Sequence, residues 1–263
     1  MNEKVCVILI HGLMRNFNTS FDLCYHNINE TIIKNNPSYK FKFIINTSYE
    51  NYFFHPEIQN SSSPSKIEIE ERIKKTYGES TFIYQNITDK EMKMNNENKI
   101  FIRHKTSLEY LNKNKIKYDK IIYIRPDIIL HDKINLDSIN NFNIICSVRT
   151  RPCYVHNRDW DYCYITNKKN FKIWSYLFIY LLYNYKFSDS DEIINRDLSL
   201  FRRERAVFIV NFKKYQDFIN ENTGLKPEGP DKNYCHLTHF VLFYMLNEGI
   251  DISTNLTYAR IIR

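Results

Sequence analysis

Residues 118–130, with the sequence YDKIIYIRPDIIL, constrain the fold more than any other part of this chain. Residues 121–124 are a short run of β-branched and aromatic side chains bounded by turn formers, which is typical of a buried parallel strand. Pro126 has no N–H to give to a ladder, so we expect the sheet to stop near it. Arg125 and Asp127 are therefore predicted at the carboxyl end of a strand, where open α/β sheets bind their ligands.

The Arg-Pro-Asp tip has two interpretations. A guanidinium and a carboxylate one residue apart are suited to hold a phosphate and, through a metal ion, a second phosphate oxygen. An ordinary strand-to-loop turn with an Arg–Asp ion pair accounts for the same residues. The spacing alone does not separate the two interpretations.

Strand-like and helix-like patterns alternate along the first half of the chain. The strand-like runs are residues 5–10, 41–45 and 81–84, and the helix-like segments are residues 18–34, 67–77 and 100–112. A β-α-β opening is the signature of a parallel sheet. We therefore predict an α/β fold with a mostly parallel central sheet flanked by helices.

The second half has a mixed α+β character. Strands are expected at residues 144–148, 160–165 and 206–210, and helices at residues 171–185 and 236–247. The chain shows no internal repeat and no convincing boundary within its 263 residues. We predict a single domain over residues 1–263, with a nucleotide-binding half at about 1–132 and an acceptor half at about 133–263.

Composition limits the compartment and the partners. The net charge is +7, but Lys and Arg alternate with Asp and Glu, so a nucleic-acid partner is not expected. The six cysteines show no CxxC spacing, which indicates reduced thiols in a cytoplasmic protein. No apolar stretch reaches the roughly 20 residues of a membrane span, so we expect no transmembrane segment.

The residues after the first strand offer one candidate site. Gly12 and Arg15 lie in the run GLMRNF, where a glycine allows close approach of a ligand and an arginine near a helix start suits a phosphate. The run is neither GxGxxG nor a P-loop. A turn with a surface arginine is the alternative.

Two further candidates lie in the second half. Asp159 and Asp161 would face the same side of a strand and suit a sugar hydroxyl, although a solvated turn is equally compatible. His236 and His239 are three residues apart near the start of a predicted helix, so both are placed to face one ligand. His236 is a candidate to complete a metal site begun by Asp127, and the alternative is capping and packing.

Three blocks together resemble the GT-A glycosyltransferase-like proteins of large DNA viruses, bacteria and algae. They are GLMRNF, the pattern Tyr-Asp-x-Ile-x-x-x-Arg-Pro-Asp, and DYCYI at residues 161–165. The family has Gly-x-x-Arg-x-Phe after its first strand, and Arg-x-Asp in the place of the Asp-x-Asp motif. The blocks lie within residues 4–250.

The resemblance implies a nucleotide-sugar-dependent transferase that uses a UDP- or GDP-sugar, Mn2+ or Mg2+, and a glycan or other hydroxyl acceptor. It places Gly12, Arg15 and Thr47 near the nucleotide, and Asp127 at the metal. Asp161 would face the acceptor as general base or sugar-orienting carboxylate. We take Asp161 and His239 as candidate catalytic residues, in a protein of the cytoplasm, or of the host cytoplasm if it is viral.

Two departures from the family pattern keep alternatives open. Arg125 stands where the usual motif has its first Asp, so either metal affinity is weaker or Arg125 itself neutralises the diphosphate. Leu237 and Thr238 stand where the family has a Pro-Glu pair. One alternative is a catalytically inert relative that binds a nucleotide sugar or glycan. Another is a basic nucleic-acid-binding or scaffolding protein.

Overall fold

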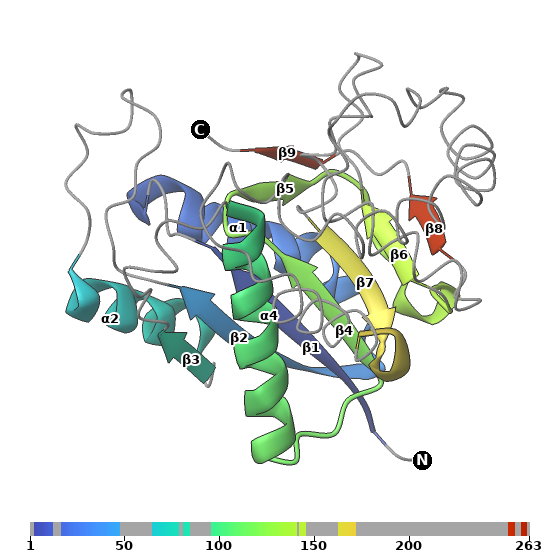
Figure 1. Ribbon diagram of the computed structural model, residues 1–263. Coiled ribbons are helices and arrows are strands. Elements are labelled where there is room, and N and C mark those ends of the chain that lie inside the picture. The colour runs from blue at the N-terminus through green and yellow to red at the C-terminus, as the bar shows by residue number, and fades with distance from the viewer. Residues whose placement is uncertain are drawn as a thin grey trace, which may run out of the picture.

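Helices and strands alternate through the first half of the chain in the computed structural model (Figure 1). The described residues are 3–12, 17–47, 65–78, 81–84, 96–140, 142–145, 163–171, 252–255 and 259–261. The strands are β1 Lys4–His11, β2 Tyr39–Thr47, β3 Thr81–Tyr84, β4 Lys120–Ile124, β5 Ile128–Leu130, β6 Phe142–Ile145, β7 Cys163–Asn167, β8 Ile252–Asn255 and β9 Ala259–Ile261. The helices are α1 Phe17–Thr31, α2 Lys66–Tyr77 and α4 Asn96–Lys113, with short 3-10 turns η1 Ile33–Asn35 and η3 Leu136–Ser138.

Seven strands form one mixed, mostly parallel sheet with the order β3-β2-β1-β4-β7-β6-β8. The pairs β2–β3, β1–β2 and β1–β4 are parallel, whereas β7 is antiparallel to both β4 and β6. Since β6 and β8 are parallel to each other, β7 runs opposite to the other six strands of this sheet. The predicted α/β class is confirmed. β5 and β9 form a separate antiparallel pair.

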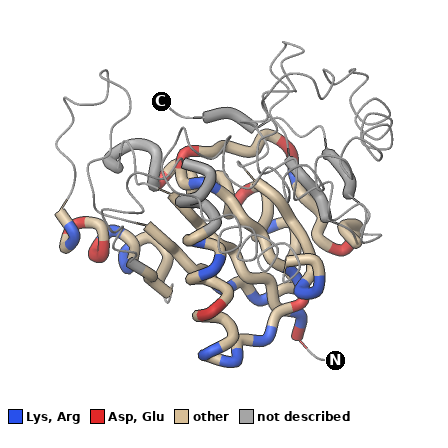
Figure 2. The backbone as a smooth tube through the Cα atoms, viewed as in Figure 1, with Lys and Arg blue, Asp and Glu red and all other residues tan. Residues whose placement is uncertain are grey.

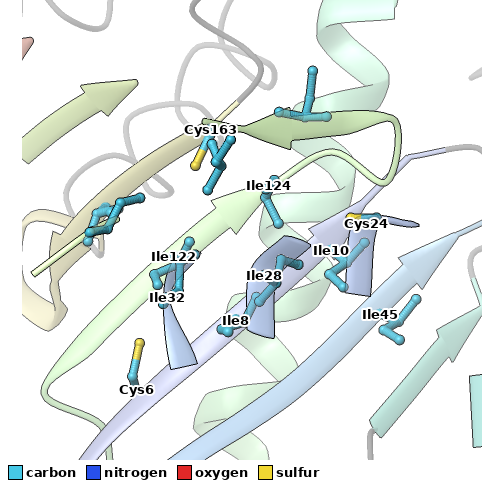
Figure 3. Packing of buried hydrophobic residues seen from close by; sticks show 14 of the residues in the cluster. Cys6, Ile8, Ile10, Cys24, Ile28, Ile32, Ile45, Ile122, Ile124 and Cys163 are labelled. Carbon is cyan, nitrogen blue, oxygen red and sulfur yellow. The ribbon is translucent and has the colours of Figure 1, made fainter. Parts of the chain in front are cut away.

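One face of the sheet is an apolar core against α1 and α2. Cys6, Ile8 and Ile10 alternate along β1 and are fully buried against α1 (Figure 3). The α1 side chains in this cluster are spaced by four residues, Cys24, Ile28 and Ile32, which places them on one helix face. Burying a side chain of this size stabilises the fold by roughly 1.5–3 kcal/mol.

The opposite face of the sheet is covered by α4, which contacts β1 and β2. Leu108 and Leu111 of α4 are buried, as are Val7 and Leu9 of β1. Towards the carboxyl ends of the strands this face becomes polar, beginning with the buried His11. The apolar part of this face therefore anchors α4, and the polar part lies beneath the edge where ligands bind in α/β sheets.

The structure confirms the predicted early elements and corrects some boundaries. The strands expected at 5–10, 41–45, 81–84 and 121–124 correspond to β1, β2, β3 and β4. The helix expected to reach residue 34 ends at Thr31, because the chain tightens into η1, where Asn36 Nδ2 donates to Ile32 O at 2.6 Å. The expected strands at 144–148 and 160–165 overlap β6 and β7, each displaced by two or three residues in its described part.

Other predicted elements lie outside the described residues. These are most of the helix at 171–185, the strand at 206–210 and the helix at 236–247. β8 and β9 are additions that the sequence analysis did not include. Among the helices that the structure describes, none combines the length and apolarity needed to cross a membrane.

Candidate functional site

The candidate site lies where the order of the parallel strands reverses. From β1 the chain passes to β2 and β3 on one side, and β4 then joins β1 on its other side. Ile10 and Ile124 are register partners, so the residues that follow them, Gly12 and Pro126 among them, leave the sheet side by side. In open α/β sheets this switch point forms the ligand-binding crevice.

Gly12 makes the close approach at this point. Its φ of +144° belongs to a region that side-chain-bearing residues rarely adopt, and its N–H donates to Asn46 O at 3.2 Å. A Cβ at Gly12 would lie 3.1 Å from Pro126 Cδ. The two segments singled out in the sequence, GLMRNF and Arg-Pro-Asp, therefore meet at Gly12.

Arg125 to Ile128 form a hydrogen-bonded β-turn. The N–H of Ile128 donates to Arg125 O at 3.3 Å, which places Pro126 at the second position of the turn, where its fixed φ is favoured. The same carbonyl lies 3.9 Å from Cys24 Sγ of α1. The turn ends the central strand as predicted and holds Arg125 and Asp127 on either side of Pro126.

Arg125 and Asp127 form a two-point ion pair. Arg125 Nε donates to Asp127 Oδ1 at 3.0 Å, and Nη2 donates to Oδ2 at 2.6 Å. The Asp127 side chain is 6% exposed, whereas that of Arg125 is 20% exposed. The ion pair considered from the sequence is present, and its cationic member is the one that reaches the surface.

This geometry bears on the expected metal ion. Both oxygens of Asp127 accept hydrogen bonds from Arg125, so a cation bound to this carboxylate would lie beside the guanidinium charge. Within the described ranges, no three or more His, Cys, Asp or Glu side chains group as metal ligands would. The donors present here fit a resident divalent cation poorly, and His236, the other predicted ligand, lies outside the described residues.

Thr47 lies on the same edge, two strands away from Arg125. It ends β2 and is the register partner of Tyr84 in β3. The side chain is fully buried, and its Oγ1 has no hydrogen-bond partner in the described part of the chain. A buried hydroxyl of this kind is expected to find a partner, so Thr47 stays a candidate for the nucleotide side of the site.

A layer of buried polar side chains lies beneath this edge, between the sheet and α4. We call it the polar layer; it consists of His11, Asn46, His104, Ser107, Tyr123 and Tyr164. His11 Nε2 and Ser107 Oγ are 2.8 Å apart, and Asn46 Nδ2 donates to Arg103 O at 3.1 Å. The sequence analysis missed this layer because its members come from four strands and one helix.

Aromatic contacts complete the polar layer. The rings of Tyr123 and Tyr164 stack with centroids 4.8 Å apart, and His104 lies 4.7 Å from Tyr123. The Tyr164 hydroxyl is 3.0 Å from the ring nitrogens of His104. His11 is 4.9 Å from His104. The strand ends of β1 and β4 are thus tied to α4 through the layer.

Both histidines of the layer are neutral near pH 7. Burial, followed by the neighbouring His104 and Arg103, lowers the pKa of His11 well below its usual value. Burial and the charge of Arg103 lower the pKa of His104 to about 3. Neutral imidazole rings can both donate and accept hydrogen bonds, which suits a buried network.

The structure brings four predicted site residues to one edge: Gly12, Thr47, Arg125 and Asp127. Arg15, Asp161, His236 and His239 lie outside the described residues. Their predicted roles at the nucleotide, the acceptor and the metal stay predictions. No model of a known protein family matches this chain, and no curated protein matches it either.

Proposed function

We propose that this protein is a GT-A-type glycosyltransferase that moves a sugar from a nucleoside-diphosphate sugar to a hydroxyl of a glycan or another acceptor. The observation that carries the proposal is the contact of Gly12 with the Arg125–Asp127 turn at the switch point. It supports the resemblance because the two blocks that carry most of it are brought together.

The sheet supports a nucleotide as part of the ligand. The parallel strands β3-β2-β1 have the order of a mononucleotide-binding half of a doubly wound sheet, and β4 adds the first strand across the switch point. Gly12 lets backbone approach at the carboxyl end of β1, and Thr47 lies nearby at the end of β2. UDP and GDP are the nucleotides that the resemblance favours.

Arg125 supplies the charge that the reaction needs. Cleavage of a sugar–phosphate bond builds negative charge on the leaving diphosphate, and a fixed cation stabilises that charge as it develops. Arg125 is a fixed cation at the strand end, because Asp127 holds its guanidinium at two points. Asp161 is proposed to orient or deprotonate the acceptor hydroxyl.

Titration calorimetry and a turnover assay test the proposal together. The wild-type chain is titrated with UDP-sugars and GDP-sugars, with and without Mn2+, and release of nucleoside diphosphate is measured with a panel of glycan acceptors. We expect saturable binding of one nucleotide class, and release that depends on an acceptor. Absence of binding by every nucleotide sugar would overturn the proposal.

Two variants sharpen the result. Asp161→Asn is expected to keep donor binding and to lose release, which separates catalysis from binding. Arg72→Gln is the control and should bind donor and release nucleoside diphosphate like the wild type. Like Arg125, Arg72 forms a two-point ion pair, but its partner Asp22 joins α2 to α1 and the pair involves none of the strand ends. Binding without release in the wild type across the acceptor panel would favour the inert relative instead.

A further inference from the structure

We propose that Arg125, held by Asp127, takes the place of a divalent cation at the donor diphosphate, so that this site binds a nucleoside diphosphate without a metal ion. The inference rests on the proposed function and specifies how its donor site works. It also chooses between the two possibilities that Arg125 left open in the sequence.

The geometry of the pair disfavours a second cation. The planar guanidinium matches the carboxylate with two parallel hydrogen bonds, at 3.0 Å and 2.6 Å. A cation that binds Asp127 would lie beside Arg125, because each carboxylate oxygen already accepts one of its N–H groups. It would then share a small, mostly buried space with the guanidinium charge, and like charges at that distance repel strongly.

Burial commits Asp127 to Arg125. A carboxylate that is 6% exposed needs a partner, because an unpaired buried charge is strongly unfavourable. Arg125 is that partner, and Asp127 is therefore committed to Arg125. The carboxylate's charge is also felt at Cys24, whose pKa is raised to about 12, first by burial and then by Asp127.

Arg125 is the member of the pair that reaches the surface. Its side chain is 20% exposed, more than three times as much as that of Asp127. Its Nε and Nη2 donate to Asp127, which fixes the plane of the guanidinium. Arginine binds phosphate oxygens through the same fork that it presents to a carboxylate.

The turn that carries Arg125 is also preorganised. Arg125 starts a turn whose second residue is Pro126, and Pro126 packs against Gly12. The backbone on both sides of the crevice is thus restricted before a ligand arrives. A cation that is already in place stabilises developing charge without reorganisation in the transition state, which is the service that a metal ion supplies elsewhere.

The test is titration calorimetry with UDP, GDP and inorganic pyrophosphate, each in excess EDTA and, separately, in Mn2+. We expect the wild type to bind a nucleoside diphosphate with the same Kd, within about twofold, in both conditions. Pyrophosphate tells whether the diphosphate is sufficient for binding or the nucleoside is also required. Binding only in Mn2+ would overturn the inference and would still support the proposed function.

Variants of the pair provide the second arm. The double variant Arg125→Gln, Asp127→Asn keeps the shapes and removes both charges, and we expect Kd to rise about tenfold to a hundredfold in EDTA and in Mn2+ alike. Arg125→Asp places a second carboxylate beside Asp127, and we expect diphosphate binding to vanish in EDTA and to return with Mn2+. The control Arg72→Gln should bind like the wild type.

The outcomes separate the two levels of the proposal. If the wild type binds no nucleoside diphosphate in either condition, the proposed function and the inference both fail. If the double variant binds as tightly as the wild type, Arg125 is only a structural ion pair and the inference fails alone. Circular dichroism of each variant reports its folding, and the wild-type comparison in EDTA decides the matter if the variants do not fold.

Discussion

At Gly12, both the backbone conformation and the packing require a residue without a Cβ. Its φ of +144° is costly for any residue with a Cβ, and the added atom would lie 3.1 Å from Pro126 Cδ. A side chain here must distort either β1 or the Arg125 turn. The candidate site therefore depends on a residue that has no functional group.

We predict that Gly12→Ala lowers the free energy of unfolding by about 1–3 kcal/mol and abolishes nucleoside-diphosphate binding. Thermal unfolding and calorimetry measure the two effects. Gly78→Ala is the matched control, because Gly78 has φ +61° but no atom within 4 Å of the added Cβ. Gly78→Ala should cost about 1–2 kcal/mol and leave binding intact. Normal binding by Gly12→Ala would contradict the placement of the site.

The buried histidines predict the direction of the pH dependence of stability. The folded-state pKa values of His11 and His104 lie below those of the unfolded chain, so the unfolded chain binds protons first as pH falls. Stability is therefore lost from about pH 6.5 downward towards about pH 3. Each histidine contributes a slope of up to about 1.4 kcal/mol per pH unit.

Urea denaturation at pH 7, 6 and 5 measures this slope. His104→Phe keeps a ring against Tyr123 and removes one titrating group, so it should reduce the slope by about half while lowering stability at pH 7. Leu108→Ala, at a buried position of the same helix that does not titrate, is the control and should lower stability without changing the slope. Equal wild-type stability at pH 7 and pH 5 would contradict the prediction, because it would show that the polar layer can be protonated without loss of stability.

Helix α4 ends in a C-terminal cap whose left-handed position is occupied by Lys115. Ile116 N donates to Leu111 O at 3.0 Å and Lys115 N donates to Asn112 O at 3.1 Å, which is the Schellman pattern. Lys115 has φ +51°, where glycine is usual. The helix that carries His104 and Ser107 is thus closed at some conformational cost.

Lys115→Gly should relieve that cost and raise the free energy of unfolding by about 0.5–1 kcal/mol. Lys113→Gly, inside the last turn of α4, should lower it by about 1 kcal/mol. Chemical denaturation of the two variants beside the wild type gives both differences. Stabilisation by neither substitution would show that the αL conformation of Lys115 is not strained.

Two asparagine side chains form hydrogen bonds with the backbone in and after β5. Asn27 of α1 donates to Leu130 O and accepts from Leu130 N, both at 2.7 Å. Asn36 donates to Ile134 O at 2.8 Å and accepts from Leu136 N at 2.7 Å. Two amides thereby attach the segment after the Arg125 turn to the end of α1.

These contacts explain what could be predicted from the sequence and what could not. β1, β2 and β4 follow from local sequence patterns, so they were predictable. β8 pairs with β6 more than a hundred residues away, and no local pattern encodes that partner. An asparagine that replaces a strand partner looks, in the sequence, like any other asparagine.

The candidate site also has parts that could be predicted from the sequence and parts that could not. The positions of Gly12, Arg125 and Asp127 just after β1 and β4 were predictable from the apolar runs that precede them. The contact of His11 with Ser107 spans 96 positions and joins a strand to a helix interior, where neither residue has a distinctive pattern. The two-point engagement of Asp127 by Arg125 depends on the turn geometry, which residue spacing does not determine.

Among the described residues, many of the basic side chains lie away from the candidate site. Many lie near the N-terminus and the lower end of α4 in the view of Figure 2. Exposed lysines at the amino edge of the sheet and in the loops beside it are Lys4, Lys40, Lys113, Lys115, Lys117 and Lys168. β1 has eight residues, or about 25 Å at about 3.3 Å each, which exceeds the Debye length of about 8 Å in physiological salt.

The double variant Lys115→Gln, Lys117→Gln should therefore leave the Kd for nucleoside diphosphate unchanged at physiological salt. Calorimetry beside the Arg125 variants measures this. The same variant tests the nucleic-acid alternative. If the wild type binds duplex DNA, and this affinity falls strongly in the variant and with added salt, a nucleic-acid-binding protein is favoured. Loss of diphosphate affinity would place the anion site at the wrong edge of the sheet.

The pairing of β1 with β4 also has a consequence for folding. Val5 N donates to Asp119 Oδ2 at 2.8 Å across 114 positions, whereas β1 and β2 are joined through one helix. Closing the longer loop costs more entropy, so β4 is expected to dock after the β1-α1-β2 unit. Because the Gly12–Pro126 contact needs both β1 and β4, helical circular dichroism should recover before nucleotide binding when the denatured chain is diluted into buffer. Substitutions that destabilise the fold would then weaken nucleotide binding before they disrupt the rest of the sheet.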